Sequence, residues 1–398
     1  MRVGVFMDAD VSSGGGFQQS LSVVKLLLSH KIDGIEYIFF ASTDKNIKTL
    51  SELGAETVKI KFNSSLRDRI CRLIAKCLRV VVGPRVPFIG YIDNVLEANN
   101  IDIAYFLSPS PYAMGLKKCP FIYTVWDTAQ RDWPEFPEVW GNLGTDMRDF
   151  LCQTTCPRAV ATLVDSETAR KSLSFYYGIG LERIYTAPFF PDIEPEAELS
   201  EDVCGKYSVK KPFIFYPAQL WPHKNHAYIL EALKKLKDKG IVIDAVFTGN
   251  DHGNGEFLKQ RTEQLGLVEQ VHWLGFVERI EIVNFYKNAL ALVMPTYLGH
   301  TNIPPLEAFK YGCPVCYSDL PDLHEQVGEA AFLMDLANSN SLAEILQKIL
   351  SDKNLVQEKI SAGYEVLKNY SPENYIAVLE KIFGKFIQTL KTHKNIEN

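Results

Sequence analysis

The architecture is clearest in the segment Phe213-Ile-Phe-Tyr-Pro-Ala-Gln-Leu-Trp-Pro-His-Lys-Asn-His226. Its first four residues are apolar, as in a strand buried on both faces, and the turn after them leads into a helix pattern over 225–239. The turn carries Lys224, whose ammonium can neutralise a diphosphate, and Asn225, which can cap the helix. We therefore predict a diphosphate site at Lys224. A solvated surface lysine is the alternative.

The same alternation of strand and helix extends through both halves of the chain. Apolar runs predict strands at 2–7, 36–41, 101–106, 120–125 and 161–164, and again at 213–216, 242–247, 271–273, 291–294 and 314–317. The acidic, proline-rich stretch 188–201 reads as a linker. We predict an α/β protein with two Rossmann-like, doubly wound domains that face a cleft. Their expected bounds are 1–190 and 191–370, and a helix in 371–398 is expected to pack back on the first domain.

Composition narrows the class of protein. The 398 residues are 46% hydrophobic and 23% charged with a net charge of −6, which is typical of a folded globular chain and predicts no nucleic-acid partner. No apolar run is long enough to span a membrane, and the N-terminus lacks a signal-peptide pattern. Eight cysteines spread thinly along the chain favour reduced thiols. We therefore expect a cytoplasmic protein.

Three glycines, Gly14 to Gly16, lie between the first strand pattern and the first helix pattern. Without a Cβ atom, the backbone can approach an anion closely, and the helix N-terminus offers free amides and partial positive charge. Gly15 and Gly16 are therefore predicted to bind an anion. A flexible turn is the alternative.

A second polar turn, Pro295-Thr-Tyr-Leu-Gly-His-Thr-Asn-Ile-Pro-Pro-Leu-Glu-Ala308, opens the helix that carries Glu307. A carboxylate near a helix start can accept both hydroxyls of a ribose. The backbone amides of Thr301, Asn302 and Ile303 are expected to face the same ligand. Alternatively, Glu307 only stabilises the helix dipole.

In this order, the three segments resemble the family 4 retaining glycosyltransferases of bacterial polysaccharide synthesis. The likeness extends through Trp126-Asp-Thr-Ala-Gln-Arg-Asp-Trp-Pro-Glu-Phe-Pro-Glu138, Leu274-Gly-Phe-Val277 and Ser318-Asp-Leu-Pro-Asp-Leu-His-Glu325. The resemblance implies the GT-B fold, a diphosphate on Lys224, a ribose on Glu307 and a nucleobase beside Phe276 and Val277. It also implies that the glycine loop with Gly15 and Gly16 lies near the acceptor and the donor phosphates. It also implies catalytic roles for Lys224, Asp127 and Glu307.

The sequence departs from that family at three positions. Gly299 stands where the first acid of a glutamate-x7-glutamate pair is expected, so His300 is assigned to the contact with the donor sugar. Gln219 replaces an arginine five residues before the lysine, which leaves one fixed charge fewer on the diphosphate. Trp126 replaces the histidine of a His-Asp pair, which removes a further expected contact to the sugar.

These features predict a hexosyltransferase that moves a sugar from an NDP-sugar to a glycan or lipid-linked acceptor in surface polysaccharide synthesis. It is expected to need no cofactor or metal, because fixed positive groups stabilise the leaving diphosphate. Asp8-Ala-Asp10 is the alternative metal site, and Cys313 with Cys316 is read as two packed thiols. The rival functions are a sugar-nucleotide epimerase or phosphorylase of the same fold, and a non-catalytic partner that binds sugar nucleotides.

A basic amphipathic pattern covers 64–85. Leu66, Ile70, Leu73, Ile74, Cys77 and Leu78 form an apolar stripe, flanked by Arg72, Lys76 and Arg79. Such a helix can lie on an anionic membrane surface, which would make the protein peripheral at the inner face of the membrane. Packing of the stripe on the first sheet is the alternative.

Overall fold

The computed structural model describes residues 1–9, 14–60, 91–140, 144–191 and 202–392. Its contacts divide the chain into two units. Unit 1 comprises Met1–Glu135, Val139–Pro188 and Pro372–Asn398, and unit 2 comprises Phe136–Glu138 and Phe189–Ser371. The division at Pro188 lies two residues before the predicted one. The basic segment 64–85 lies outside the described residues.

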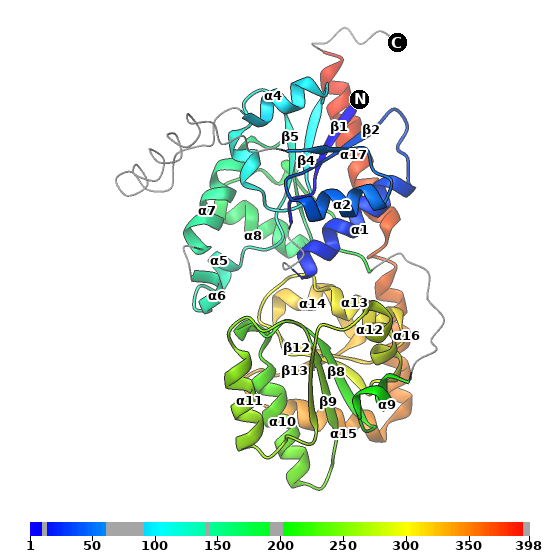
Figure 1. Cartoon of the computed structure of the whole chain (residues 1–398). Coiled ribbons are helices and arrows are strands. Elements are labelled where there is room, and N and C mark those ends of the chain that lie inside the picture. Colours follow the sequence, from blue (N-terminus) through cyan, green and yellow to red (C-terminus); the bar gives the residue numbers. More distant parts are fainter. Residues whose placement is uncertain (10–13, 61–90, 141–143, 192–201, 393–398) are drawn as a thin grey trace. The chain divides into compact units, whose positions relative to one another are not determined.

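Unit 1 is built on a parallel sheet of seven strands in the order β3-β2-β1-β4-β5-β6-β7 (Figure 1). The strands are β1 (Arg2–Phe6), β2 (Glu36–Ala41), β3 (Thr57–Lys59), β4 (Ile103–Phe106), β5 (Phe121–Thr124), β6 (Ala161–Val164) and β7 (Ile184–Thr186). The longer helices are α1 (Gly15–Ser29), α2 (Asp44–Glu52), α4 (Tyr91–Ala98), α7 (Gly144–Thr155), α8 (Glu167–Tyr177) and α17 (Pro372–Leu390), with a short turn at α5 (Ala129–Asp132). The short turn α6 (Pro137–Trp140) is divided between the two units after Glu138. The central strands are apolar on both faces because helices cover both sides of the sheet.

Unit 2 repeats the design with six parallel strands in the order β10-β9-β8-β11-β12-β13. They are β8 (Phe213–Pro217), β9 (Asp244–Thr248), β10 (Val271–Gly275), β11 (Ala291–Met294), β12 (Val315–Ser318) and β13 (Ala331–Met334). The helices are α9 (Val203–Tyr207), α10 (His226–Asp238), α11 (Gly255–Gln264), α12 (Arg279–Asn288), α13 (Ile303–Lys310), α14 (Pro321–Val327), α15 (Asn340–Ser351) and α16 (Lys353–Leu367).

The last helix, α17, belongs to unit 1 although it follows unit 2 in the chain. Seven of its side chains are buried, and the Tyr375 hydroxyl lies 2.6 Å from that of Tyr105 in β4. The amphipathic pattern of this helix is therefore satisfied by the first sheet.

Both sheets have one place where the strand order reverses. In unit 1 it lies between β1 and β4, and in unit 2 between β8 and β11. The loops that leave two such strands run in opposite directions and open a crevice at the carboxyl edge of the sheet, where ligands of doubly wound folds bind. The turns singled out from the sequence follow these strands: the glycine turn follows β1, the Lys224 turn follows β8, and the His300 loop follows β11.

Candidate functional site

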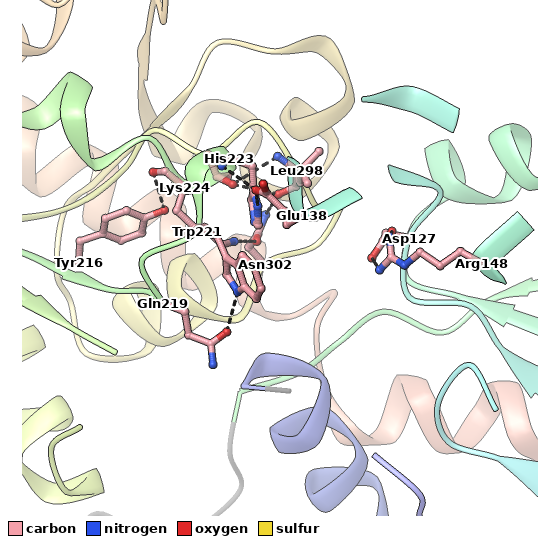
Figure 2. Close-up of polar contacts among 11 residues, drawn as sticks. Asp127, Glu138, Arg148, Tyr216, Gln219, Trp221, His223, Lys224, Leu298 and Asn302 are labelled. Atoms are coloured by element: carbon pink, nitrogen blue, oxygen red, sulfur yellow. Dashed lines mark hydrogen bonds and ion pairs between the residues drawn. The ribbon is translucent and has the colours of Figure 1, made fainter. Parts of the chain in front are cut away.

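Lys224 ends a short 3₁₀ turn, η6 (Pro222–Lys224), which joins β8 to α10. Its ammonium Nζ lies 3.5 Å from the side-chain oxygen of Asn302, in the loop after β11 (Figure 2). The Tyr216 hydroxyl donates to the Lys224 carbonyl at 3.2 Å and fixes the backbone there. The structure thus brings together two predicted donor-binding residues that lie 78 positions apart.

Asn225 occupies the N-cap position of α10 as expected, but its side chain does not cap the helix. Asn225 has a φ of 55° and makes no side-chain bond to the first turn of α10. Asparagine tolerates this left-handed conformation better than most residues, so its role is to let the chain turn sharply from η6 into the helix.

The residue before Lys224 is anchored by a carboxylate. Glu138 accepts hydrogen bonds from both the backbone amide of His223, at 2.9 Å, and its ring nitrogen Nδ1 (Figure 2). The bonds from His223 outweigh the effect of burial and lower the pKa of Glu138, so that this carboxylate is ionised at neutral pH. Phe136 packs beside the same turn, with its ring 5.3 Å from that of Tyr297. The sequence did not predict the contact between Glu138 and His223, because the two residues lie 85 positions apart in the chain.

Gln219 stands where an arginine was expected, and its side chain has a different task. Its carbonyl oxygen accepts a hydrogen bond from the Trp221 indole at 3.0 Å. The indole in turn stacks on the ring of His252 at 4.0 Å. Gln219 thus orients an aromatic pair beside the Lys224 turn and contributes no positive charge.

The loop after β11 explains why an acid is absent at position 299. Gly299 has a φ of +94°, and a Cβ there would lie 3.0 Å from the Asn302 side chain. Both the backbone conformation and the close approach favour glycine. His300, next in the chain, is only 6% exposed, and its ring nitrogen Nδ1 has no hydrogen-bond partner among the described residues. His300 stays the predicted sugar contact.

Asn302 is held from several sides. Its backbone amide donates to Gln326 at 2.9 Å, and its side-chain nitrogen donates to Gly299 and to the Tyr317 hydroxyl, at 2.8 and 2.6 Å. The expectation that this backbone amide faces a ligand is therefore wrong for Asn302. Thr301 is buried beside it, and Ile303 opens α13. The side-chain oxygen of Asn302 lies 3.5 Å from the ammonium of Lys224.

Glu307 is buried and paired. Its carboxylate receives an ion pair from Arg279 at the start of α12 and a hydrogen bond from the Tyr286 hydroxyl at 3.0 Å. Arg279 begins α12 shortly after β10 ends, and between them lie Phe276, which is 82% exposed, and Val277, which is buried. Sequence reasoning missed Arg279, although its place just after a strand end was a usable signal.

In unit 1, Gly16 is explained by packing. A Cβ at this position would lie 2.5 Å from the Trp126 ring. The indole thus gives a packing reason for glycine at this position, and contact of Gly16 with a phosphate stays a prediction. Gly14, with a φ of 60°, provides the sharp entry into α1, and Gly15 is its exposed first residue.

Two acidic side chains lie at the carboxyl edge of the first sheet. Asp127 pairs with Arg148 through nitrogens at 3.0 and 3.3 Å, as Figure 2 shows. Asp8 accepts a hydrogen bond from Ser108 at 2.8 Å, and desolvation raises its pKa to about 6. Ser108 follows β4, so this bond spans the strand reversal. Arg148 was not predicted.

No cluster of three or more histidine, cysteine or acidic residues suited to a metal occurs within the described parts of the chain. Cys313 and Cys316 are buried free thiols, as expected. None of the described helices is long and apolar enough to cross a membrane.

Parts of the chain are similar in sequence to known glycosyltransferases. Residues 205–366 match the model of the glycosyl transferases group 1. The O-antigen chain mannosyltransferase RfbU of Salmonella typhimurium is 27% identical over 201 residues, which cover 50% of this chain and 54% of that protein. The UDP-Gal:alpha-D-GlcNAc-diphosphoundecaprenol alpha-1,3-galactosyltransferase of Escherichia coli is 26% identical over 48% of this chain and 50% of its own length. The chain thus spans about half the length of these relatives.

Solved structures resemble nearly the whole chain. Anabaena Alr3699/HepE in complex with UDP-glucose superposes with a TM-score of 0.72 at 16% identity, covering 98% of this chain and 100% of that one. WaaG, a glycosyltransferase involved in lipopolysaccharide biosynthesis, gives a TM-score of 0.64 at 16% identity, covering 94% and 98%. At this identity the likeness establishes the fold. The chain therefore has the GT-B fold, and its residues 205–366 are similar to the group 1 glycosyl transferases.

Proposed function

We propose that this protein is a hexosyltransferase that moves a sugar from a nucleoside diphosphate sugar to a glycan or lipid-linked acceptor in surface polysaccharide synthesis. The observation that carries the proposal is the meeting of Lys224 and Asn302 across the strand reversal of unit 2, inside the domain matched to the family. The names of the relatives, a mannosyltransferase and a galactosyltransferase of O-antigen or lipid-linked substrates, support the substrate class.

In this proposal the nucleotide lies on unit 2, with its diphosphate on Lys224 and its ribose on Glu307. As the bond between sugar and phosphate breaks, negative charge grows on the diphosphate, and a fixed ammonium stabilises that charge more than it stabilises the ground state. Trp221, His252 and the exposed Phe276 offer aromatic surface near the same edge for the nucleobase. Asp127 is proposed to be the carboxylate that faces the transferred sugar.

Retention of anomeric configuration and independence from metal ions are parts of the proposal. The first follows from the family resemblance of the sequence. The second is supported by the fixed cation Lys224, since neutralisation of the leaving group is the task that a metal otherwise performs.

The test is a transfer assay with sugar-labelled UDP-glucose, UDP-galactose and GDP-mannose, and with octyl mannoside and octyl N-acetylglucosaminide as lipid-mimicking acceptors. We expect free nucleotide and a labelled acceptor adduct, with the donor's anomeric configuration and equal yield in excess EDTA. Loss of activity in EDTA with rescue by Mn²⁺ would contradict the metal-independent mechanism. An isomerised donor identifies an epimerase, a sugar phosphate a phosphorylase, and tight binding without product a non-catalytic partner.

A peripheral membrane location is also proposed, from the basic pattern at 64–85. We expect the protein to sediment with anionic liposomes at low salt, because each basic residue near such a surface contributes about 1 kcal/mol. Changing Arg72, Lys76 and Arg79 together to Glu should weaken sedimentation, while neutral liposomes serve as the control. Wild-type protein that stays in the supernatant at low salt would point to a soluble acceptor.

A further inference from the structure

A short segment from the first half of the chain, Phe136–Glu138, belongs to unit 2, although the residues on either side of it belong to unit 1. Its Glu138 bonds to His223, as Figure 2 shows, and the exposed fractions of the two side chains are 8% and 12%. The segment lies outside the residues matched to the family model, 205–366, so that match assigns it no role.

Glu138 fixes the backbone of the Lys224 turn. One oxygen of its carboxylate accepts hydrogen bonds from the backbone amide of His223, at 2.9 Å, and from the ring nitrogen Nδ1 of the same residue. Hydrogen bonds to an ionised acceptor are stronger than those between neutral groups. The carbonyl of the next residue, Lys224, is held by the Tyr216 hydroxyl at 3.2 Å. The turn is therefore fixed both before and after the Lys224 side chain.

The same segment also contacts the loop after β11. The Phe136 ring centre lies 5.3 Å from that of Tyr297 in this loop and 6.3 Å from that of His223. The backbone amide of Tyr297 donates to the His223 carbonyl at 3.0 Å, so the two loops are also bonded to each other. Asn302, 3.5 Å from the ammonium of Lys224, lies in the loop after β11. The spacing of the two loops thus determines where the ammonium lies.

We propose that the segment Phe136–Glu138 positions Lys224 for the reaction, with Glu138 acting through His223. The inference rests on the proposed function, in which Lys224 stabilises the leaving diphosphate. A misplacement of about 1 Å in a group that acts on the transition state can cost a hundredfold in rate. Because Gln219 leaves one fixed charge fewer on the diphosphate, the reaction depends more strongly on the placement of Lys224. Glu138 is in this view a positioning residue that does not touch the substrate.

The decisive test is a double-mutant cycle between Glu138→Gln and Lys224→Ala. Glu138→Gln keeps the size of the side chain and removes the charge that holds His223. With labelled UDP-glucose or GDP-mannose and an octyl glycoside, we expect kcat to fall about tenfold and donor affinity to change less. In the Lys224→Ala protein the same change should lower kcat by less than about twofold, because the side chain through which Glu138 acts is gone.

Glu281→Gln is the matched control. Glu281 is a buried carboxylate of unit 2 that also accepts a hydrogen bond from a backbone amide, that of Glu278 at 2.8 Å, and one from a basic side chain, Lys206 at 2.7 Å. Both glutamine variants should lower the thermal midpoint by a similar amount. We expect kcat to fall in Glu138→Gln and to stay at the wild-type value in Glu281→Gln. This comparison separates loss of a buried charge from displacement of Lys224.

His223→Gln tests the same contact from the other side and serves if Glu138→Gln does not fold. It removes the ring and keeps the backbone amide that donates to Glu138. We expect kcat to fall roughly three- to tenfold, and this loss should also disappear in the Lys224→Ala protein.

The outcomes separate this inference from the proposed function. Equal fold losses of kcat with and without Lys224 would show that Glu138 acts on the fold or on another group, and would overturn the positioning role alone. An unchanged kcat in Glu138→Gln would overturn it as well. Wild-type protein that transfers sugar from none of the labelled donors overturns the proposed function, and the inference that rests on it.

Discussion

Lys224→Ala is expected to lower kcat by about a hundredfold or more, with little change in the thermal midpoint. The ammonium of Lys224 is proposed to meet charge that develops on the diphosphate only as the glycosidic bond breaks. Its removal therefore affects the transition state more than the bound donor, and kcat should fall more than affinity.

The fold should tolerate this change. The ammonium lies 3.5 Å from the side-chain oxygen of Asn302, and the bond that fixes the turn goes to the Lys224 backbone carbonyl. Asn302 keeps its bonds to Gly299, Tyr317 and Gln326 in the variant. Circular dichroism and thermal unfolding should therefore match the wild type.

Lys234→Ala is the control for loss of a lysine. Lys234 lies on α10, which follows the Lys224 turn, and pairs with Asp238 at the surface. Exposed pairs of this kind contribute roughly 0 to 1 kcal/mol, so both stability and turnover should be nearly unchanged. Equal kinetics for Lys224→Ala and Lys234→Ala would remove Lys224 from the reaction and favour the solvated-lysine alternative.

The sequence predicted the layout of both sheets because a strand apolar on both faces carries a strong signal. Strands at Glu36–Ala41, Ala161–Val164 and Ala291–Met294 are as expected. The sequence missed β3 and β7, whose three residues are too few to show a pattern and which form because a neighbouring strand offers hydrogen bonds. It also missed β13, a short apolar run that fits a buried helix equally well.

The sequence predicted which loops carry the candidate site, but it did not predict the contacts of their side chains. Chain order placed Lys224 and Asn302 after strands that prove to be neighbours at the reversal. Which side chain each residue contacts depends on partners far away in the chain. Examples are the ion pairs of Glu307 with Arg279 and of Asp127 with Arg148, and the contact of His223 with Glu138. A motif shows that a loop is polar, whereas tertiary packing determines which of its groups are already engaged.

Glu307→Gln is expected to weaken the binding of free UDP or GDP by about tenfold or more, measured by calorimetry. A carboxylate has about four lone-pair sites, so Glu307 can hold Arg279 and Tyr286 and still accept ribose hydroxyls. Hydrogen bonds to a charged acceptor contribute about 1.5 to 3 kcal/mol, which corresponds to a tenfold or larger loss. An amide replaces one acceptor with a donor and has no charge.

The same variant should also lose stability, since the pair with Arg279 is broken. That loss is limited to about 1 kcal/mol, because the Arg279 side chain is 39% exposed and water screens the pair. A fall in the thermal midpoint alone therefore does not distinguish a ribose ligand from a residue that only stabilises α13. The binding measurement must be compared with a glutamate in the same surroundings.

Glu281 provides that comparison. Its side chain is 4% exposed, and its carboxylate accepts hydrogen bonds from the Lys206 ammonium at 2.7 Å and the Tyr207 hydroxyl at 2.8 Å. Glu307 is likewise bonded to a basic side chain and a tyrosine. It lies on α12 and is not among the predicted ligands. Glu281→Gln should lower the thermal midpoint about as much as Glu307→Gln and leave nucleotide affinity unchanged. If the two variants instead bind UDP and GDP equally well, Glu307 is a structural partner of Arg279, and the ribose must be held by another group of unit 2.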